Sequence, residues 1–237
     1  MKYAVISDIH GNMDALDAVL SDAEKQSADI FLFAGDYCLS MPFPEQAVQR
    51  IACMDNAFVI RGNEEQYIER MQGEDEGRWE GGQMHISCWC VQALSDESKM
   101  FLRRLPERKQ FRDEESGVVF HMSHSSQDII GNAELSKFSC PAIPLMYKER
   151  ELKHSQLLSD IRKHLSGNEE FQRQCDKLED GVYIFGHSHI QWFIQKGKKI
   201  FINPGSCGLP MDSCERGAPY TLIEADEKGI KIDERRI

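Results

Sequence analysis

The sequence predicts an α/β fold in which two packed, mixed β-sheets are flanked by helices. Three observations support it. The first sixty residues alternate between short apolar runs and amphipathic stretches, residues 111–125 are typical of a hairpin, and the chain after residue 180 consists of apolar runs separated by turn residues. With 237 residues, 41% of them hydrophobic, we expect one domain over residues 1–237.

The amino-terminal part is expected to form a parallel β-α-β-α-β unit. Apolar strands are predicted at residues 2–7, 30–35 and 57–60. Helices are predicted at residues 12–25, where apolar residues recur at helical spacing, and at residues 44–54, which begin with a proline. Strands that are continuously apolar and joined by helices pair in parallel and are buried on both faces.

The middle of the chain predicts two helical insertions, and the end predicts strands. Residues 64–107 are mostly helical in pattern, with an acidic, glycine-containing break at 72–77, and residues 145–179 are helical and strongly charged. Residues 181–236 contain five apolar runs, with GKK and DEKG as turn signals. We expect the insertions to lie outside the sheets and to overhang the functional site.

Composition limits the partners. No apolar run approaches the roughly 20 residues that span a bilayer, and the apolar start is too short for a signal peptide because it meets Asp8. We therefore expect a cytoplasmic protein without a membrane partner. The net charge of −11 argues against binding long nucleic acids, but bound cations would allow a small phosphorylated substrate. The eight cysteines are expected to be reduced thiols.

Polar residues gather where the apolar strands end, and ligands bind at such ends in open α/β sheets. These stretches, which carry Asp, His or Asn beside Gly, are residues 7–12, 35–36, 62–63, 121–125, 186–189 and 203–206. On an extended backbone, Asp8 and His10 project from the same face, as do His187 and His189. Asp, His and Asn together suit Mn²⁺, Fe²⁺ or Zn²⁺. Residues 203–206 are expected to be a turn that shapes the floor of the site.

Five of these motifs follow one another in a characteristic order: D-I-H at 8–10, G-D at 35–36, G-N at 62–63, H-S at 124–125 and G-H-S-H at 186–189. In this order, each at a strand end, they resemble the motifs of the calcineurin-like metallophosphoesterase superfamily. The short chain and the N-P-G-S stretch at 203–206 are most similar to its small bacterial phosphodiesterase branch. The resemblance runs from residue 1 to about residue 225, and the two helical insertions match least.

The resemblance implies a site for two divalent metal ions. Its ligands would be Asp8, His10 and His189 for one metal, Asn63, His124 and His187 for the other, and Asp36 as the bridge between them. Mn²⁺ or Fe²⁺ is expected, with Zn²⁺, Ni²⁺ and Mg²⁺ as alternatives. Two such ions about 3.5–4 Å apart turn a shared water into hydroxide near neutral pH. This hydroxide would attack phosphorus in line, while the ions neutralise the developing charge.

One position departs from the family pattern. Larger phosphatases follow Gly-Asn with a histidine that protonates the leaving oxygen or binds the phosphate, whereas this chain has Glu64 there. General acid help is worth about 10²–10⁴-fold. Good leaving groups, such as aryl or nucleoside phosphates, should therefore be favoured, or the proton comes from His121, His85 or Glu64. Arg61 is predicted to clamp the phosphate, since guanidinium pairs with phosphate at two points.

Some residues also have structural interpretations. Asn63 is a favoured N-cap residue with Gln66 three positions on, but its place among the motifs favours a ligand and, with Asp36, a catalytic role. His121 competes with His124, and the H-S-S stretch at 124–126, which resembles the H-G-S turn of the family, favours His124. Asn12 is expected to be a helix N-cap rather than a substrate contact.

Together these features predict a metal-dependent phosphoesterase, with phosphodiesters as the expected substrates. The substrate would be small and phosphorylated, and nucleotides belong to this class. One alternative is a phosphomonoesterase or nucleotide-polyphosphate hydrolase on the same metals, against which the missing histidine counts. Another is a non-catalytic scaffold of the same fold, which predicts eroded ligands, whereas all seven positions carry usable donors.

Overall fold

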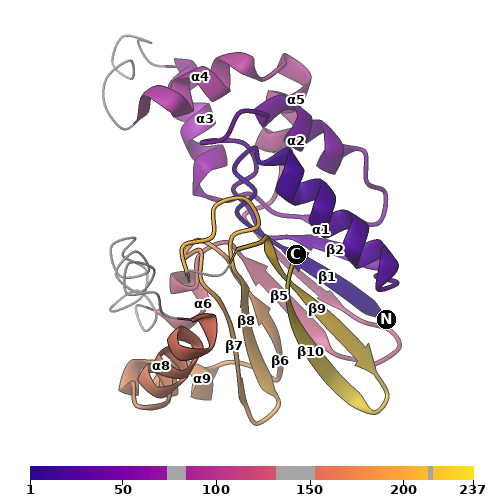
Figure 1. Cartoon of the computed structure of the whole chain (residues 1–237). Helices are drawn as coiled ribbons and strands as arrows, with labels where there is room; N and C mark the ends of the chain where they lie inside the picture. Colours follow the sequence, from indigo (N-terminus) through magenta and orange to yellow (C-terminus); the bar gives the residue numbers. More distant parts are fainter. Residues whose placement is uncertain (74–83, 132–152, 213–215) are drawn as a thin grey trace.

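The computed structural model describes residues 1–73, 84–131, 153–212 and 216–237. Within these ranges the chain forms two five-stranded β-sheets that pack face to face, with helices on the outer side of each sheet (Figure 1). The arrangement confirms the predicted fold of two mixed sheets flanked by helices.

The first sheet has the strand order β10-β9-β1-β2-β3. Its strands are β1 (Lys2–Ile6), β2 (Ile30–Phe33), β3 (Ala57–Val59), β9 (Pro219–Asp226) and β10 (Gly229–Arg236). Strands β1, β2 and β3 are parallel, whereas β9 is antiparallel to both β1 and β10. The parallel pairing of the amino-terminal strands agrees with their continuous apolar pattern.

The second sheet has the order β4-β5-β6-β8-β7. Its strands are β4 (Arg108–Arg112), β5 (Val119–Ser123), β6 (Gly181–Ile184), β7 (Gln191–Lys196) and β8 (Lys199–Pro204). Strands β5, β6 and β8 are parallel, and β4 and β7 pair antiparallel at the two edges. The predicted hairpin is the β4–β5 pair.

The helices form the two outer layers. Those that share an apolar core with the first sheet are α1 (Met13–Lys25), α2 (Pro44–Ala52), α3 (Asn63–Gly73), α4 (His85–Ala93) and α5 (Asp96–Arg104); those that share one with the second are α6 (Gln127–Ile130), α8 (His154–Ser166) and α9 (Glu169–Lys177). Helices α3, α4 and α5 lie beyond the strand ends in Figure 1. Helices α3 to α5 fall largely in the predicted insertion 64–107, and α8 and α9 in 145–179. Residues 74–83 and 145–152 of these insertions lie outside the described residues.

Three apolar layers join the elements. Strand residues such as Val5 and Phe120 pack between the two sheets. Helices α1 to α5 share a core with the outer face of the first sheet, which includes Ile6, and the helices on the other side pack against Trp192. Because Val5 and Ile6 enter different layers, both faces of β1 are buried, which explains its continuous apolar run.

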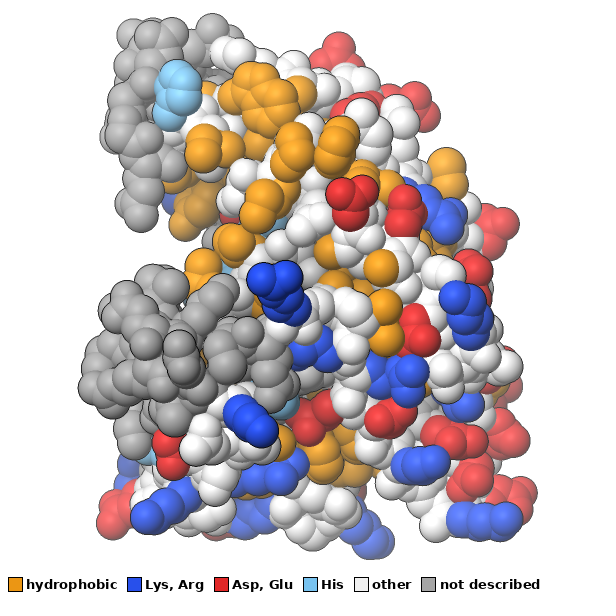
Figure 2. Space-filling model, in the orientation of Figure 1, with side chains coloured by type: hydrophobic (Ala, Val, Ile, Leu, Met, Phe, Trp, Pro, Cys, Tyr) orange, Lys and Arg blue, Asp and Glu red, His pale blue; other side chains and the backbone are white. Residues whose placement is uncertain are grey.

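Large apolar side chains also remain on the outer surface of the helical layer over the first sheet. Ile86, Trp89 and Met100 are 54%, 47% and 46% exposed, and Figure 2 shows hydrophobic side chains gathered in the part of the molecule that α4 and α5 occupy in Figure 1. None of the helices in the described ranges is long and apolar enough to cross a membrane.

The carboxyl ends of the parallel strands of both sheets meet, and the loops that follow them are hydrogen-bonded to one another. The Asp8 N–H donates to the Gly35 carbonyl at 3.0 Å, between the loops after β1 and β2. From the second sheet, the N–H groups of Cys207 and Gly208 donate to the carbonyls of Ser7 and Asp8 at 2.9 and 3.0 Å. The loops of the two sheets therefore form one connected platform for polar side chains.

Candidate metal centre

The structure brings all seven predicted metal ligands together at this platform. They fall into two groups: Asp8, His10 and His189 in one, and Asp36, His124 and His187 with Asn63 in the other. Within each His and Asp set, the potential ligand atoms lie within 4.8 Å of one another. The composition of the two groups is the one that the family resemblance implies.

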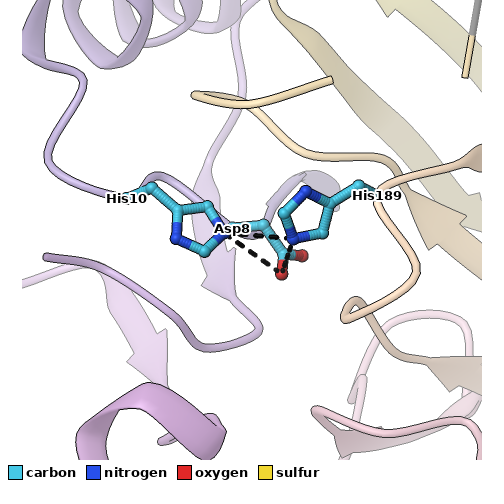
Figure 3. Close-up of side chains that lie close together, drawn as sticks. All are labelled: Asp8, His10 and His189. Atoms are coloured by element: carbon cyan, nitrogen blue, oxygen red, sulfur yellow. Dashed lines mark hydrogen bonds and ion pairs between the residues drawn. The ribbon is translucent and has the colours of Figure 1, made fainter. Parts of the chain in front are cut away.

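In the first group, three electron-pair donors face one another (Figure 3). The Nε2 atoms of His10 and His189 are 3.1 Å apart, and Asp8 Oδ1 lies 3.3 Å from His189 Nε2 and 3.9 Å from His10 Nε2. A cation about 2.0–2.2 Å from nitrogen and oxygen ligands holds them about 3 Å apart. The observed spacings therefore fit a shared cation.

Hydrogen bonds to the backbone determine which ring nitrogen is available. His10 Nδ1 lies 2.9 Å from the Leu39 carbonyl oxygen, and His189 Nδ1 lies 2.9 Å from that of Leu209. A carbonyl oxygen only accepts, so each Nδ1 carries the hydrogen. In the neutral form that binds metal, both rings would therefore direct a lone pair on Nε2 into the space that the Asp8 carboxylate faces. Lone pairs and a carboxylate that converge in this way need a positive charge between them. Metal-binding histidines are usually oriented as here, by an acceptor that bonds the ring nitrogen opposite the metal.

The second group is built in the same way. His124 Nδ1 donates to the Ala34 carbonyl at 2.7 Å, and its Nε2 lies 3.1 Å from Asn63 Oδ1 and 3.2 Å from Asp36 Oδ2. Asn63 Oδ1 is also 2.8 Å from His187 Nδ1. An amide oxygen, a carboxylate and two imidazoles thus converge, which is a donor set that suits Mn²⁺, Fe²⁺ or Zn²⁺.

Asp36 lies between the two groups. Its carboxylate belongs to the set with His124 and also lies within 4.8 Å of ligand atoms of His10 and Glu64. Asp36 is buried, at 2% exposed, and its Oδ1 also accepts a hydrogen bond from the Glu64 N–H at 2.9 Å. This position is the one that a ligand bridging two cations needs.

The charges of the site compensate one another even with protein groups alone. Burial opposes protonation of His10, but the Glu64 carboxylate, helped by Asp36 and Asp8, raises its pKa to about 10. Burial likewise opposes protonation of His124, but Asp36 raises its pKa to about 10. The pKa of Asp36 is lowered, since His124 outweighs the effect of burial. Protons therefore occupy the role that metal cations would take over.

The ligand residues adopt an unusual backbone conformation. Of the described residues, seven non-glycine residues have positive φ: Asp8 (53°), His10 (56°), Asp36 (58°), His187 (68°), His189 (57°), Ser27 (59°) and Ser40 (112°). Five of these are predicted ligands, and strained conformations concentrate at functional sites. The expectation of an extended backbone at D-x-H and H-x-H is therefore wrong. The left-handed turns instead let His187 and His189 face different groups.

Two glycines permit the close approach of the loops. A Cβ atom on Gly186 would lie 2.1 Å from Ser7 Oγ and 2.5 Å from Asp8 Oδ2. A Cβ on Gly62 would lie 2.2 Å from Asp36 Oδ1. Only glycine lets the backbone pass this close to the two buried carboxylates, which explains glycine beside the Asp and His ligands.

Glu64, which stands where larger phosphatases have histidine, faces His10. Its Oε2 lies 3.1 Å from His10 Nδ1 and accepts a hydrogen bond from the Leu39 N–H at 3.2 Å. Burial and the nearby Asp36 carboxylate raise the pKa of Glu64 to about 8. The side chain therefore contacts the Nδ1 edge of His10, whereas the Nε2 atom faces the other ligands of its group.

The role of Glu65 is not among the sequence predictions. Its buried carboxylate accepts hydrogen bonds from the N–H groups of Asp36, Tyr37 and Gly62 at 3.0, 2.9 and 2.7 Å. The signal was present, because a glutamate three residues after the cap position reaches back in a capping box. The capping pair is therefore Gly62 and Glu65, and the predicted pair of Asn63 and Gln66 is wrong. Asn63 itself begins α3 and still turns its amide oxygen to the ligands.

Arg61 lines a cavity of about 240 Å³ together with Asn63 and His187. Its Nη1 donates to Glu69 at 3.1 Å and its Nη2 to Glu107 at 2.6 Å. The predicted clamp thus lies beside the ligand groups, with two of its donors engaged by carboxylates. Its contact with phosphate stays a prediction.

The remaining candidates lie elsewhere. His121 stacks on Tyr183 outside both ligand groups, and His85 starts α4. The predicted turn at 203–206 is only partly correct, because Asn203 and Pro204 are the last residues of β8 and the chain leaves the strand at residue 205. Asn203 donates to the Gly186 carbonyl at 2.8 Å, and Ser206 Oγ donates to the Asp8 carbonyl at 2.7 Å, so the stretch does contact the loops that carry the ligands.

Known proteins resemble this chain over nearly its whole length. A model of the calcineurin-like phosphoesterase superfamily domain matches residues 1–228. The uncharacterized protein MJ0912 of Methanocaldococcus jannaschii is 26% identical over 234 residues, 99% of this chain and 86% of that protein.

Two crystal structures have a similar fold. A metallophosphoesterase from Sphaerobacter thermophilus is 19% identical with a TM-score of 0.67, covering 100% of this chain and 89% of that chain. The hypothetical protein PH1004 from Pyrococcus horikoshii is 18% identical with a TM-score of 0.68, covering 100% and 87%. From its fold, its donor groups and its match over residues 1–228, the chain belongs to the calcineurin-like phosphoesterase superfamily, a family of divalent-metal-dependent hydrolases of phosphoric esters.

Proposed function

We propose that this protein is a phosphodiesterase that acts through two divalent metal ions, Mn²⁺ or Fe²⁺ in the first place. The observation that carries the proposal is the convergence of the His10 and His189 lone pairs on the space faced by the Asp8 carboxylate, repeated around His124 in the second group. When bound, the two ions would supply a water activated for attack on phosphorus and would neutralise the charge of the phosphoryl oxygens.

Hydrogen bonds within the protein orient the proposed ligands before metal binds. Backbone carbonyls fix the rings of His10, His124 and His189, so that little motion is needed when cations bind. Asp8 and Asp36 contribute two carboxylates, and the other five proposed ligands are neutral when they bind metal. Two divalent ions would therefore leave the site with an excess of positive charge, which favours an anionic phosphate.

The preference for diesters over monoesters is inferred from Glu64, which replaces the histidine of the larger phosphatases. Glu64 is held on the Nδ1 edge of His10, and no histidine occupies the place of the missing general acid. Without a strong proton donor, the leaving oxygen must depart with little help, so esters with good leaving groups are favoured. A diester also carries less negative charge than a monoester, so an ionised Glu64 would repel it less.

The test is the hydrolysis of bis-p-nitrophenyl phosphate beside p-nitrophenyl phosphate. Metal-stripped protein would be assayed with and without added Mn²⁺, with Asp36→Ala as the site variant and Asp17→Ala, an exposed helix position, as the matched control. Diester turnover that depends on Mn²⁺ and is lost only in Asp36→Ala supports the proposal. Turnover of the monoester alone would replace it with a phosphomonoesterase. Metal binding without turnover of either would favour the scaffold alternative.

A further inference from the structure

A second cavity adjoins the candidate metal centre on the outer face of the second sheet. It has a volume of about 430 Å³, which lies in the range of about 300–1,000 Å³ that is common for small-molecule sites. Asp128 lines both this cavity and the smaller one that holds Asn63 and His187. A ligand bound at the metal centre could therefore extend past Asp128 into this space.

One wall of this cavity is formed by His121, the last ring in a row of three stacked rings. The rings of His121 and Tyr183 are 4.5 Å apart and nearly parallel, at 6°, and Tyr183 stacks in turn on Phe201 at 5.2 Å. Strand β5 lies between β4 and β6, and His121 pairs with Tyr183 on β6 and with Gln110 on β4. One face of the imidazole is thus covered by Tyr183, and the other is turned toward β4, where Gln110 lines the cavity.

His121 offers a neutral aromatic surface. Its Nε2 atom is shielded from solvent, has no hydrogen-bond partner among the described residues, and lies 3.5 Å from where a Cβ on Gly181 would be. Burial lowers the pKa of the imidazole, so the ring is uncharged at neutral pH. An uncharged, flat ring at the end of a stack is a surface on which another planar ring can continue the stack.

An arginine side chain, Arg108, lies on the side of the cavity that faces the metal centre. Arg108 Nη2 lies 3.2 Å from Asp128 Oδ1, and their side chains are 64% and 41% exposed, so the ion pair is open to solvent. Ser123 Oγ donates to the other oxygen of Asp128 at 2.8 Å. His121 precedes His124 by three residues, about 10 Å along a strand. Polar groups that suit a sugar or a phosphate thus lie between the metal ligands and the aromatic surface.

We propose that this cavity, lined by Arg108, Gln110, His121 and Tyr183, is a subsite for the planar base of a nucleoside esterified to the phosphate that the metal centre hydrolyses. The base continues the ring stack on His121, and the sugar passes Arg108 and Asp128. The hydrolytic part of this inference rests on the proposed function, whereas the binding of a base does not need turnover. The substrate class is accordingly a nucleoside phosphodiester.

The kinetic test compares two diesters with the same leaving group, thymidine 5′-(p-nitrophenyl phosphate) and methyl p-nitrophenyl phosphate. The ratio of their kcat/KM values measures the contribution of the nucleoside alone. We expect His121→Leu to lower this ratio by about five- to 150-fold, the worth of one stacked base, and His121→Phe to retain it. Arg112→Ala, a basic residue on the same strand that lines a different cavity, should leave the ratio unchanged.

A second variant, which fills the cavity, keeps the test decisive if His121→Leu does not fold. Thermal unfolding shows whether His121→Leu has kept its fold; if it has not, Gln110→Trp fills the cavity from an exposed position of β4 and is expected to lower the ratio instead. Turnover of the methyl diester should be unchanged in every variant. A ratio that stays at the wild-type value in folded His121→Leu or Gln110→Trp overturns the subsite.

A binding measurement separates the subsite from the proposed function. Saturation-transfer NMR with thymidine and metal-free protein needs no turnover, and the base protons should show transfer in wild type and Arg112→Ala but not in His121→Leu. Binding of this kind in a protein that hydrolyses neither diester would support the subsite and reject the proposed function. Hydrolysis of the methyl diester without thymidine binding would reject the subsite and retain the function.

Discussion

The Glu65 carboxylate lies beneath the backbone of Asp36, whose N–H donates to Glu65 Oε2 at 3.0 Å. The same carboxylate accepts from Tyr37 and Gly62, so one side chain of α3 holds the loop after β2 and the loop after β3 together. These loops carry Asp36 and Asn63, which belong to the second ligand group. Glu65 thus positions ligands through their backbone, without belonging to any of the ligand groups itself.

Replacing Glu65 by Gln should therefore weaken both the fold and the metal site. The amide keeps one acceptor oxygen, so at least one of the three buried N–H groups loses its partner, at a cost of about 1–3 kcal/mol in the free energy of unfolding. We expect metal affinity to fall by about 10–100-fold, as for other residues that orient ligands. Urea unfolding and Mn²⁺ titration measure the two effects. Glu24→Gln, at an exposed position of α1, is the control, and equal metal affinity in both variants would contradict a positioning role.

Metal binding should release protons. The pKa values of His10 and His124 are raised to about 10, so both rings are protonated at pH 7.5 in metal-free protein, whereas metal requires neutral rings. Filling both sites should therefore release about two protons, and affinity should rise with pH up to about 10. Calorimetry in buffers of different ionisation enthalpy counts the protons; a value near zero would show that the rings are neutral before metal binds.

The same shifts predict how the stability of metal-free protein depends on pH. A histidine whose folded pKa is raised above its unfolded value of about 6.5 stabilises the fold fully below that value, and the contribution is lost as pH rises through the folded pKa. We expect metal-free protein to lose stability between about pH 6.5 and 10, through His10 and His124. Protein saturated with Mn²⁺ should lack this loss, because its histidines are already neutral. Thermal unfolding across this range distinguishes the two.

Gly186→Ala should disrupt the first ligand group. The added Cβ would lie 2.5 Å from Asp8 Oδ2, and the buried backbone leaves little room for relaxation, so we expect about 1–3 kcal/mol of destabilisation and loss of metal binding. Gly167→Ala is the matched control, since its Cβ would meet its nearest neighbour at an ordinary 3.6 Å. Metal titration and thermal unfolding of the two variants give the comparison. Wild-type metal affinity in Gly186→Ala would mean that the loop can move away from Asp8.

Arg61→Ala separates a phosphate clamp from a surface ion pair. The ion pairs with Glu69 and Glu107 involve exposed carboxylates, and such pairs contribute about 0–1 kcal/mol to stability. We expect a small change in melting temperature and a fall of about tenfold in kcat/KM for bis-p-nitrophenyl phosphate, carried by KM. Arg50→Ala, a half-exposed arginine on α2, controls for the loss of charge. An unchanged KM in Arg61→Ala would leave the arginine a structural role only.

Local sequence was sufficient for the strands and for the positions of the ligand motifs. Runs such as that of β1 are apolar on both faces and stop at once in Asp, His or Asn beside Gly, so the element and the polar residue at its end are visible together. The parallel order of β1, β2 and β3 followed from the same runs. Strand ends of this kind predict that Asp8, Asp36 and Asn63 lie near one another, the family resemblance implies that they are metal ligands, and the structure brings them together.

Contacts between distant segments decided the rest. The left-handed turns at His187 and His189, the Glu64 carboxylate against His10, and the stacking of His121 on Tyr183 involve partners from different elements. Glu65 meets Asp36 across 29 positions of the chain. A side chain chooses among rotamers and partners only after the sheets have packed, because the energies that separate these choices come from burial and from neighbours that local sequence does not contain.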